Sequence, residues 1–204
     1  MNEYVEKIIE LADEFGVGTT SEMEKFFEEY ASNDMPAALK HHNNRQWGLW
    51  SHLYEMLRLA LIKNKEYSLG YNNYSIIKVV LCHDLDKFEK GCQPRVLKNG
   101  AISTDKSKGP LEYQPEMYEV GHGENSLYLA SKWFALDAME RQAIRFHMSF
   151  FDYYVDFEKV KGKLSKFTNF IFLCDYEASM LIELTYDLSE EPMQYAEEIL
   201  KRGI

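Results

Sequence analysis

Apolar residues recur along most of the chain with the three-to-four-residue period of an amphipathic helix, not the two-residue period of a strand. The N-terminal stretch carries such a stripe on Tyr4, Ile8 and Leu11, and the stripe ends near Gly16. The same period predicts further helices over residues 21–30, 47–63, 75–87, 123–134, 137–147 and 163–184, with a short one after Pro192.

Polar residues mark where some of these helices begin. Thr20 or Ser21 is positioned to cap the second helix, and Glu24 follows Ser21 by three residues, as in a capping box. Asp137 is positioned to cap a later helix in the same way. The stretch 75–87 is nearly all apolar, so we expect it at the centre of the fold.

Residues 90–121 break the helical pattern, because Gly, Pro and Lys are concentrated there. Within this segment, RVLKNGAIS has the Asn-Gly signature of a tight hairpin. Loops this long are often lids or binding loops. We therefore predict an all-α helical bundle with an irregular loop and hairpin insertion at about 90–121.

The chain reads as one domain over residues 1–204. Helices within 1–35 are expected to pack on a core that spans 40–180, and a C-terminal helix is expected within 185–204. The 204 residues are 46% apolar and 14% aromatic, which is ample material for one core. The N-terminal helices are expected either to cover the core or to form the face of a homodimer.

The net charge of −10 argues against binding to long nucleic acid, whose usual footprint is a basic face. It does not exclude a small anionic substrate, because a cation or a few local Lys and Arg residues can reverse the field in a cleft. The N-terminus lacks the pattern of a signal peptide, and no apolar run is long enough to cross a membrane. Three cysteines without metal-type spacing fit a reducing setting, so we expect a cytoplasmic protein with no membrane association.

Several ionisable residues stand in or just after apolar helical stretches. His52 lies in LWSHLYEML, His83 ends IIKVVLCHD, His147 ends AIRFH and Asp175 lies in FIFLCDYEA. Such groups need partners when they are buried. A shared divalent cation would satisfy them, and so would a network of hydrogen bonds in the core. Separate polar groups at helix ends are the third reading.

The order of these residues resembles the HD-domain superfamily of metal-dependent phosphohydrolases. The first His, the adjacent pair and the distant Asp correspond to His52, His83, Asp84 and Asp175, and HDLDK matches the family's His-Asp-x-x-Lys. GHGENSLYLA and AIRFHMSFF place two more His residues where binuclear members have theirs. Upstream, KHHNNRQWGLWSH resembles the segment before the first ligand in some members. The resemblance covers about residues 40–180.

The resemblance implies a ligand set for two ions. His52, His83, Asp84 and Asp175 would hold one ion, and Asp84, His122 and His147 would hold the other. Imidazole and carboxylate ligands suit Fe, Mn, Co, Ni or Zn and do not choose among them. Two such ions would share a hydroxide and clamp phosphoryl oxygens during attack. Asp84 and Lys87 are thus the expected catalytic residues, with Lys87 one turn beyond His83 and able to neutralise phosphate charge.

Five residues are further expectations for substrate binding: His42, Lys87, Glu124, Arg95 and Arg145. Each also has a plain structural reading. His42 can lie in a surface loop, and Glu124 can be a favourable acid in the first turn of a helix. Arg95 belongs to a locally basic insertion that suits a lid over a polyanion but equally suits a solvated loop. Arg145 precedes His147 by two residues and can face the cleft or pair with an acid.

The expected function is metal-dependent hydrolysis of a phosphate ester or anhydride in a nucleotide or similar small molecule, through a metal-activated hydroxide. The alternative is a nucleotide-sensing or nucleotide-binding HD module without turnover, and a weaker one is a di-iron oxygenase. The chain lacks the Gly-Tyr-Pro signature of cyclic-di-GMP phosphodiesterases and any separate nucleic-acid-binding domain. A nucleotide-sized substrate is therefore favoured over a polynucleotide.

Overall fold

The computed structural model describes residues 2–114, 121–151, 156–188 and 190–203, and helices dominate these ranges. Their only sheet has two short strands. The elements in chain order are α1 Glu3–Glu14, α2 Ser21–Tyr30, α3 Gly48–Glu66, α4 Asn73–Cys82, α5 Leu85–Lys90, β1 Cys92–Pro94, β2 Leu111–Tyr113, α6 His122–Trp133, α7 Ala138–Arg145, η1 Ser149–Phe151, α8 Phe157–Val160, η2 Lys161–Lys163, α9 Lys166–Glu177, η3 Ala178–Ile182 and α10 Glu191–Arg202.

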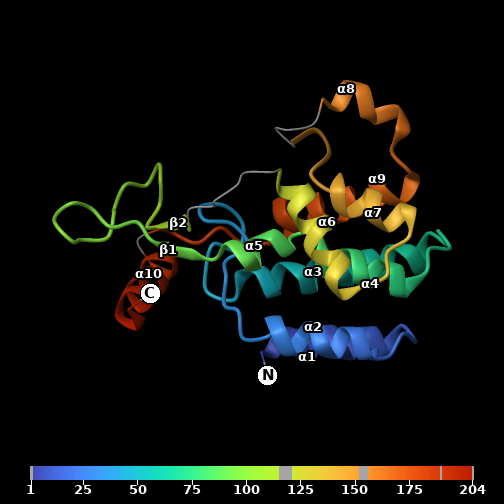
Figure 1. Cartoon of the computed structure of the whole chain (residues 1–204), viewed down its shortest axis with the longest axis horizontal. Helices are drawn as coiled ribbons and strands as arrows, with labels where there is room; N and C mark the ends of the chain where they lie inside the picture. The colour runs from blue at the N-terminus through green and yellow to red at the C-terminus, as the bar shows by residue number, and fades with distance from the viewer. Residues whose placement is uncertain (1, 115–120, 152–155, 189, 204) are drawn as a thin grey trace.

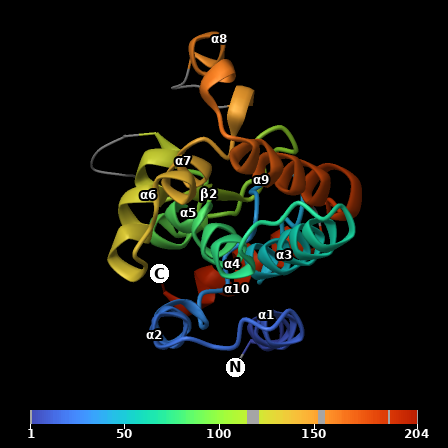
Figure 2. The same cartoon turned by 90° about the vertical axis from the view of Figure 1, so that its right-hand side faces the viewer.

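Helix α4 lies at the centre of the bundle, as its apolar sequence predicts. It contacts α3, α6, α7 and α9, which surround it (Figures 1 and 2). Ile76, Ile77 and Val80 are fully buried. Burial of each such side chain contributes about 1.5–3 kcal/mol. The one buried Lys of α4, Lys78, donates to the carboxylate of Glu140 at 2.7 Å and so joins α4 to α7.

Capping side chains fix several helix starts. Thr20 caps α2 by accepting a hydrogen bond from the Met23 amide, and Asp137 forms a complete capping box with Glu140. The sequence predicted Asp137 as a cap and left Thr20 and Ser21 open for α2; Thr20 is the cap, and Ser21 is the first residue of α2 and does not form the predicted capping box with Glu24. Each cap satisfies backbone N–H groups that have no partner within their own helix.

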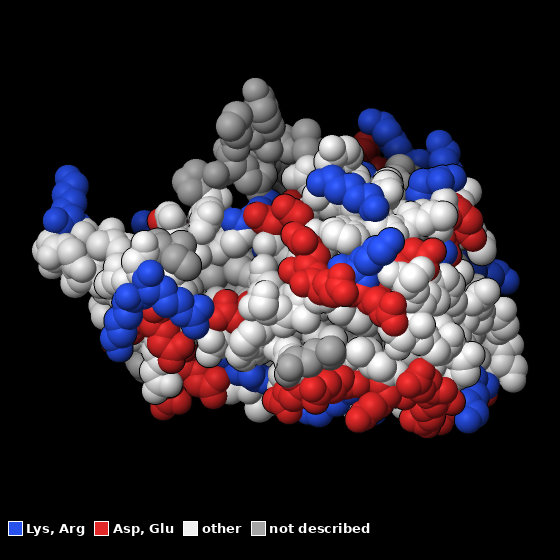
Figure 3. Space-filling view, turned by 60° about the horizontal axis from the view of Figure 1, so that its bottom comes forward, with Lys and Arg blue, Asp and Glu red and all other residues white. Residues whose placement is uncertain are grey.

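Helices α1 and α2 form a layer beneath the bundle (Figure 1), where α1 packs on α3 and α2 on α6. Aromatic side chains join this layer to the core. Trp50 of α3 lies 5.0 Å from Phe88, and Tyr30 of α2 stacks on Phe88 at 5.4 Å, both measured between ring centroids. The indole N–H of Trp50 donates to the carbonyl of Asn33. Acidic side chains gather on the face that comes forward in Figure 3. The first turns of α1 and α2 contain four exposed Glu residues.

The helix predicted over 75–87 is broken into α4 and α5. The imidazole Nδ1 of His83 donates to the carbonyl of Val80 at 2.8 Å, and this carbonyl would otherwise accept the amide of Asp84 in a continuing helix. Asp84 then leaves the helical region with φ −107° and ψ 18°, and α5 begins at the next residue. The break places both side chains of the His-Asp pair at a junction rather than on a regular helix surface.

The insertion contains the predicted Asn-Gly hairpin. Val96 pairs with Ile102 in an antiparallel bridge, and Gly100 has φ +83°, a value that a glycine adopts without strain. A second antiparallel pairing, between β1 and β2, closes the base of the loop with Cys92 opposite Tyr113. The part of the segment at 115–120 lies outside the described residues.

The helix predicted over 163–184 is shorter and changes type at its end. Ser165 caps α9, which runs to Glu177 and continues as the π-helical turn η3. The amide of Glu183 donates to the carbonyl of Ala178, which is the five-residue spacing of a π-helix. Such turns are frequent at functional sites.

The all-α prediction is confirmed, with the small β1–β2 sheet as its irregular part. The three cysteines are all free and buried, and burial raises the pKa of the Cys92 and Cys174 thiols to about 12. Among the described residues, no helix is both long and apolar enough to span a bilayer.

Candidate metal centre

Five helical regions bring the six predicted ligand residues together. His52 comes from α3, His83 and Asp84 from the α4–α5 junction, and His122 is the first residue of α6. His147 follows the end of α7 and Asp175 lies in α9. All six are buried or partly buried, and we call them the His/Asp cluster.

The carboxylate of Asp84 lies between two groups of imidazoles. Its Oδ1 is 2.7 Å from Nε2 of His122 and 3.7 Å from Nε2 of His147. Its Oδ2 is 3.5 Å from Nε2 of His83 and 3.8 Å from Nε2 of His52. Each oxygen of one carboxylate thus faces a different pair of imidazoles.

This arrangement gives two groups that share Asp84 and whose ligand atoms are close enough to hold a metal ion. The first is His52, His83 and Asp84, and the second is Asp84, His122 and His147. Among the described residues, His42, His52 and Glu183 form a third group of this kind. Within each group the ligand atoms lie within 4.8 Å of one another. Asp175 adds a carboxylate oxygen 3.3 Å from Nε2 of His52, beside the first group.

The second nitrogen of two cluster imidazoles is held by the main chain. Nδ1 of His83 donates to the carbonyl of Val80, and Nδ1 of His147 donates to that of Ile144 at 2.7 Å. In both cases the acceptor is three residues earlier, on the helix that the His follows. These bonds orient each ring and leave Nε2 as the nitrogen that faces the cluster.

Carboxylates hold the second nitrogen of the other two imidazoles. Nδ1 of His122 is 2.8 Å from Oδ2 of Asp86, and Nδ1 of His52 is 2.8 Å from Oε1 of Glu183. Contacts of this kind are the usual outer partners of metal-ligating histidines, because they fix the tautomer and strengthen the ligand nitrogen.

The nitrogens that face inward fit a bound cation. Nε2 of His52 and Nε2 of His83 are only 3.2 Å apart, and in both rings Nδ1 already has an acceptor. With both Nδ1 atoms donating, the Nε2 lone pairs of the two rings are left to hold either one shared proton or a cation. Nε2 of His147 is also buried, and it has no hydrogen-bond partner among the described residues. A divalent ion accepts such lone pairs, and imidazoles with carboxylates suit Mn, Fe, Co, Ni or Zn.

The charges of the cluster also favour a cation. Burial would raise the pKa of Asp84, but Lys87 and His83 outweigh burial and hold this pKa well below its usual value. Burial lowers the pKa of His52, but Glu183 and Asp175 raise it to about 10. These carboxylates therefore stay charged and attract either a proton on His52 or a metal ion in its place.

The His/Asp cluster opens into a cavity of about 620 Å³, the cluster cavity. Asp84, Lys87, His147 and Asp175 reach it from the cluster side. The ammonium group of Lys87 donates to Oδ2 of Asp84 at 2.6 Å. The rest of the described lining is largely apolar and aromatic.

The residues expected to bind substrate fall into two sets. His42 and Lys87 line the cluster cavity, and Nδ1 of His42 is 2.7 Å from Oε2 of Glu183. Glu124 and Arg145 form an ion pair with each other between α6 and α7. Arg95 pairs with Glu112 across the insertion at 2.7 Å. Glu124, Arg145 and Arg95 are not among the described residues that line the cavity, and their contact with substrate stays a prediction.

Two carboxylates of the site were not expected from the sequence. Asp86 lies within HDLDK, two residues after Asp84, so its position was a usable signal. Glu183 stands in LIEL between apolar residues, but a helix continuing to Leu184 gave no reason for it to turn inward. The π-helical turn supplies that reason, because Glu183 is the residue that ends it.

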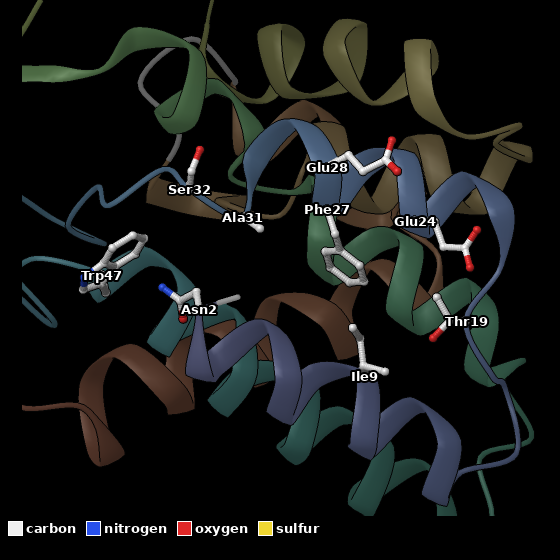
Figure 4. Close-up of a pocket in the computed structure, with 9 residues that line it drawn as sticks. All are labelled: Asn2, Ile9, Thr19, Glu24, Phe27, Glu28, Ala31, Ser32 and Trp47. Carbon is white, nitrogen blue, oxygen red and sulfur yellow. The ribbon is translucent and has the colours of Figure 1, made fainter.

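A second cavity, of about 800 Å³, lies between α1 and α2 (Figure 4). Ile9 and Phe27 point toward each other across it, and Glu24 and Glu28 lie at its rim. No His or Cys is among its described lining residues. Of these two cavities, the cluster cavity is the smaller, and it is the one lined by imidazoles that could bind a metal ion.

Comparison of the chain with protein-family models, curated proteins and solved structures gives no match.

Proposed function

We propose that this chain is a metal-dependent phosphohydrolase of the HD-domain type, acting on a nucleotide or a similar small phosphate ester. The observation that carries the proposal is the position of Asp84. Its two oxygens face different imidazole pairs, and Lys87 contacts one of them from the cavity. The order of the six cluster residues along the chain resembles that family, which adds to the same reading.

The proposal assigns the ligands as follows. His52, His83, Asp84 and Asp175 hold one divalent transition-metal ion, and Asp84, His122 and His147 hold a second. Ions bound there would lower the pKa of a coordinated water and polarise a phosphoryl group. The outer contacts from Asp86, Glu183 and two main-chain carbonyls keep the imidazoles oriented.

Lys87 is the residue of the chain that meets the phosphate. Its side chain is 17% exposed, and it lines the cavity while it is bonded to Asp84. The carboxylate of Asp84 raises the pKa of Lys87 despite burial, so the ammonium stays charged. A fixed cation at this position stabilises the negative charge of a phosphoryl oxygen beside the cluster.

The test is the Asp84→Ala variant, with Asp13→Ala in the exposed face of α1 as its matched control. Both proteins are loaded separately with Mn, Fe or Co, and metal content and phosphate release are measured on a panel of phosphate esters. We expect Asp84→Ala to lose metal and at least 10³-fold of its activity, because one carboxylate serves both ion positions, whereas Asp13→Ala behaves as wild type.

Full hydrolysis by a metal-loaded Asp84→Ala protein would refute the mechanism. Saturable binding of nucleotides by the wild type, with no product under any of the three metals, would instead identify a nucleotide-binding module without turnover.

A further inference from the structure

We infer that the ligand of the cluster cavity carries a single phosphate group on an apolar body that contains a ring. This inference rests on the proposed phosphohydrolase function and names the substrate class of the same site. It follows from two properties of the cavity: how few cations reach it, and what forms its wall.

Two cations, Lys40 and Lys87, are among the described residues that line the cavity. Both are engaged, since Lys40 donates to the carbonyl of Ser107 at 2.7 Å and Lys87 donates to Asp84. The stretches 115–120 and 152–155, PEMYEV and DYYV, contain no Lys or Arg in their sequence. A polyphosphate chain is usually bound by several cations and by backbone N–H groups. The described lining therefore offers Lys87 to a phosphate at the cluster and few cations to any further phosphate.

Part of the described lining forms an apolar wall. It includes Met148, Phe151, Phe172, Tyr176 and Met180. The rings of Phe151 and Tyr176 are nearly parallel, with an interplanar angle of 5° and centroids 5.9 Å apart, and Phe172 lies 6.0 Å from Tyr176. Tyr176 is 38% exposed and Met180 is 61% exposed, so this apolar surface is open to a ligand.

The same helix supplies a metal ligand and this wall. Phe172, Tyr176 and Met180 are four residues apart, which places them along one side of α9 and its continuation η3. Asp175 precedes Tyr176 and points to the cluster. A phosphate at Asp84 and Lys87 therefore leaves the attached group against the aromatic wall.

The apolar character of this wall indicates which kind of group the phosphate is attached to. A second or third phosphate extending from the cluster would lose water against Phe172 and Met180 without gaining a partner, which is unfavourable. A ring in the same place buries apolar surface and meets aromatic faces, which is favourable.

The first test measures binding without turnover. Phenylphosphonate and methylphosphonate share the phosphate-like head, but neither has an ester bond to hydrolyse. Calorimetric titration of the metal-loaded wild type should give at least a tenfold lower Kd for phenylphosphonate. Tyr176→Ala should weaken phenylphosphonate binding about 3- to 10-fold and leave methylphosphonate unchanged.

The matched control is Leu173→Ala, on the same helix but 57% exposed and not among the described lining residues. It should bind both phosphonates as the wild type does. Equal Kd values for the two phosphonates in the wild type, or no binding of either, would overturn the inference, and so would equal effects of the two alanine variants. A second pair, Met180→Ala with Leu181→Ala as its exposed control, repeats the comparison if Tyr176→Ala fails to fold.

The second test measures turnover of naphthyl phosphate, glycerol phosphate, adenosine monophosphate and adenosine triphosphate. The inference expects naphthyl phosphate and the monophosphate to exceed glycerol phosphate and the triphosphate by at least tenfold in kcat/KM. A kcat/KM for adenosine triphosphate equal to that for adenosine monophosphate would overturn the inference and leave the proposed hydrolysis intact. The phosphonate preference without turnover of any ester supports the inferred ligand class and refutes the proposed hydrolysis.

Discussion

At the scale of single residues, Glu183 is the outer carboxylate that orients His52. Its two oxygens hold two imidazoles, with Oε1 at 2.8 Å from His52 and Oε2 at 2.7 Å from His42. The side chain is 2% exposed. Burial raises the pKa of Glu183, but His52 and His42 lower it to about 2, so the carboxylate stays charged at neutral pH.

We predict that Glu183→Gln lowers metal affinity by about 10- to 100-fold, because an outer carboxylate orients His52 and strengthens its ligand nitrogen. The amide keeps the shape of Glu183 but removes its charge. Competition with a chelating dye measures the change. Glu177→Gln is the matched control, since the Glu177 carboxylate pairs with Lys63 and not with the cluster. An unchanged affinity in Glu183→Gln would show that this contact does not position His52.

At the scale of elements, α6 and α7 approach so closely that Gly123 is required between them. A Cβ atom at Gly123 would lie 2.2 Å from the carbonyl oxygen of Arg145. The Glu124–Arg145 ion pair fastens the same contact. This close approach brings His122, at the start of α6, to His147, which follows α7, with their ring centroids 5.2 Å apart.

The Gly123→Ala variant should therefore separate the two helices and weaken the second ion position while leaving the first intact. We expect metal analysis of the purified variant to show one equivalent less than in the wild type. Gly162→Ala is the control, because a Cβ there meets nothing within 4 Å. Full metal content in Gly123→Ala would mean that the two helices can move apart without loss of the site.

One carboxylate joins the C-terminal helix to the loop after α2. Asp34, in the loop after α2, accepts hydrogen bonds from Gln46, Tyr195 and Arg202 at 2.8–2.9 Å. Burial raises the pKa of Asp34, but these donors lower it below its ordinary value of 3.8. The folded pKa is thus lower than the unfolded one, so the contribution to stability is complete above about pH 4 and is lost as pH falls through the folded pKa.

Asp34→Ala should lower the free energy of unfolding at pH 7 by about 1–3 kcal/mol. The difference from the wild type should shrink as the pH is lowered below about 4. Urea unfolding at a series of pH values measures both, with the exposed Asp13→Ala variant as the control. A difference that does not change with pH would show that the charge of Asp34 contributes little.

Sequence patterns predicted most of the helices but not the positions at which two of them are interrupted or change type. The period of apolar residues gave α1, α2 and α3, because their buried stripes follow from local spacing. The break after α4 depends on the His83 side chain binding the carbonyl of Val80, which competes with the helix in a way that the period does not record. The π-helical turn after α9 adds one residue without altering the apolar pattern, so the pattern predicts an ordinary helix there.

At the scale of the whole molecule, the cluster joins elements that are far apart in the sequence. Its six residues span positions 52 to 175 and lie in or beside α3, α4, α5, α6, α7 and α9. The resemblance of their order to the HD-domain family is what singles out these six in the sequence. Packing between helices decides which imidazoles face the Asp84 carboxylate and which are hydrogen-bonded to Asp86 or Glu183. The order of the residues along the chain does not contain this information.

A bound cation should accordingly stabilise the whole fold. At a metal concentration of 100 times Kd, linkage gives about 2.7 kcal/mol for one site. For a chain of this size that corresponds to a rise in Tm of about 5–10 °C. Calorimetry with metal, and again after addition of a chelator, measures the shift and its reversal. The Asp84→Ala variant should show little or no shift, and an equal rise in that variant would indicate binding elsewhere.

The buried cysteines make the surface of the molecule chemically selective. Cys82, Cys92 and Cys174 are shielded from solvent, and burial raises the pKa of each thiol, so none is expected to react with a maleimide in the folded state. A cysteine placed at the exposed hairpin position Lys98 should take up one dye per chain. Mass spectrometry counts the label, and more than one per chain would reveal opening of the core. The chain is thus suited to single-site labelling through one introduced cysteine, without removal of any native cysteine.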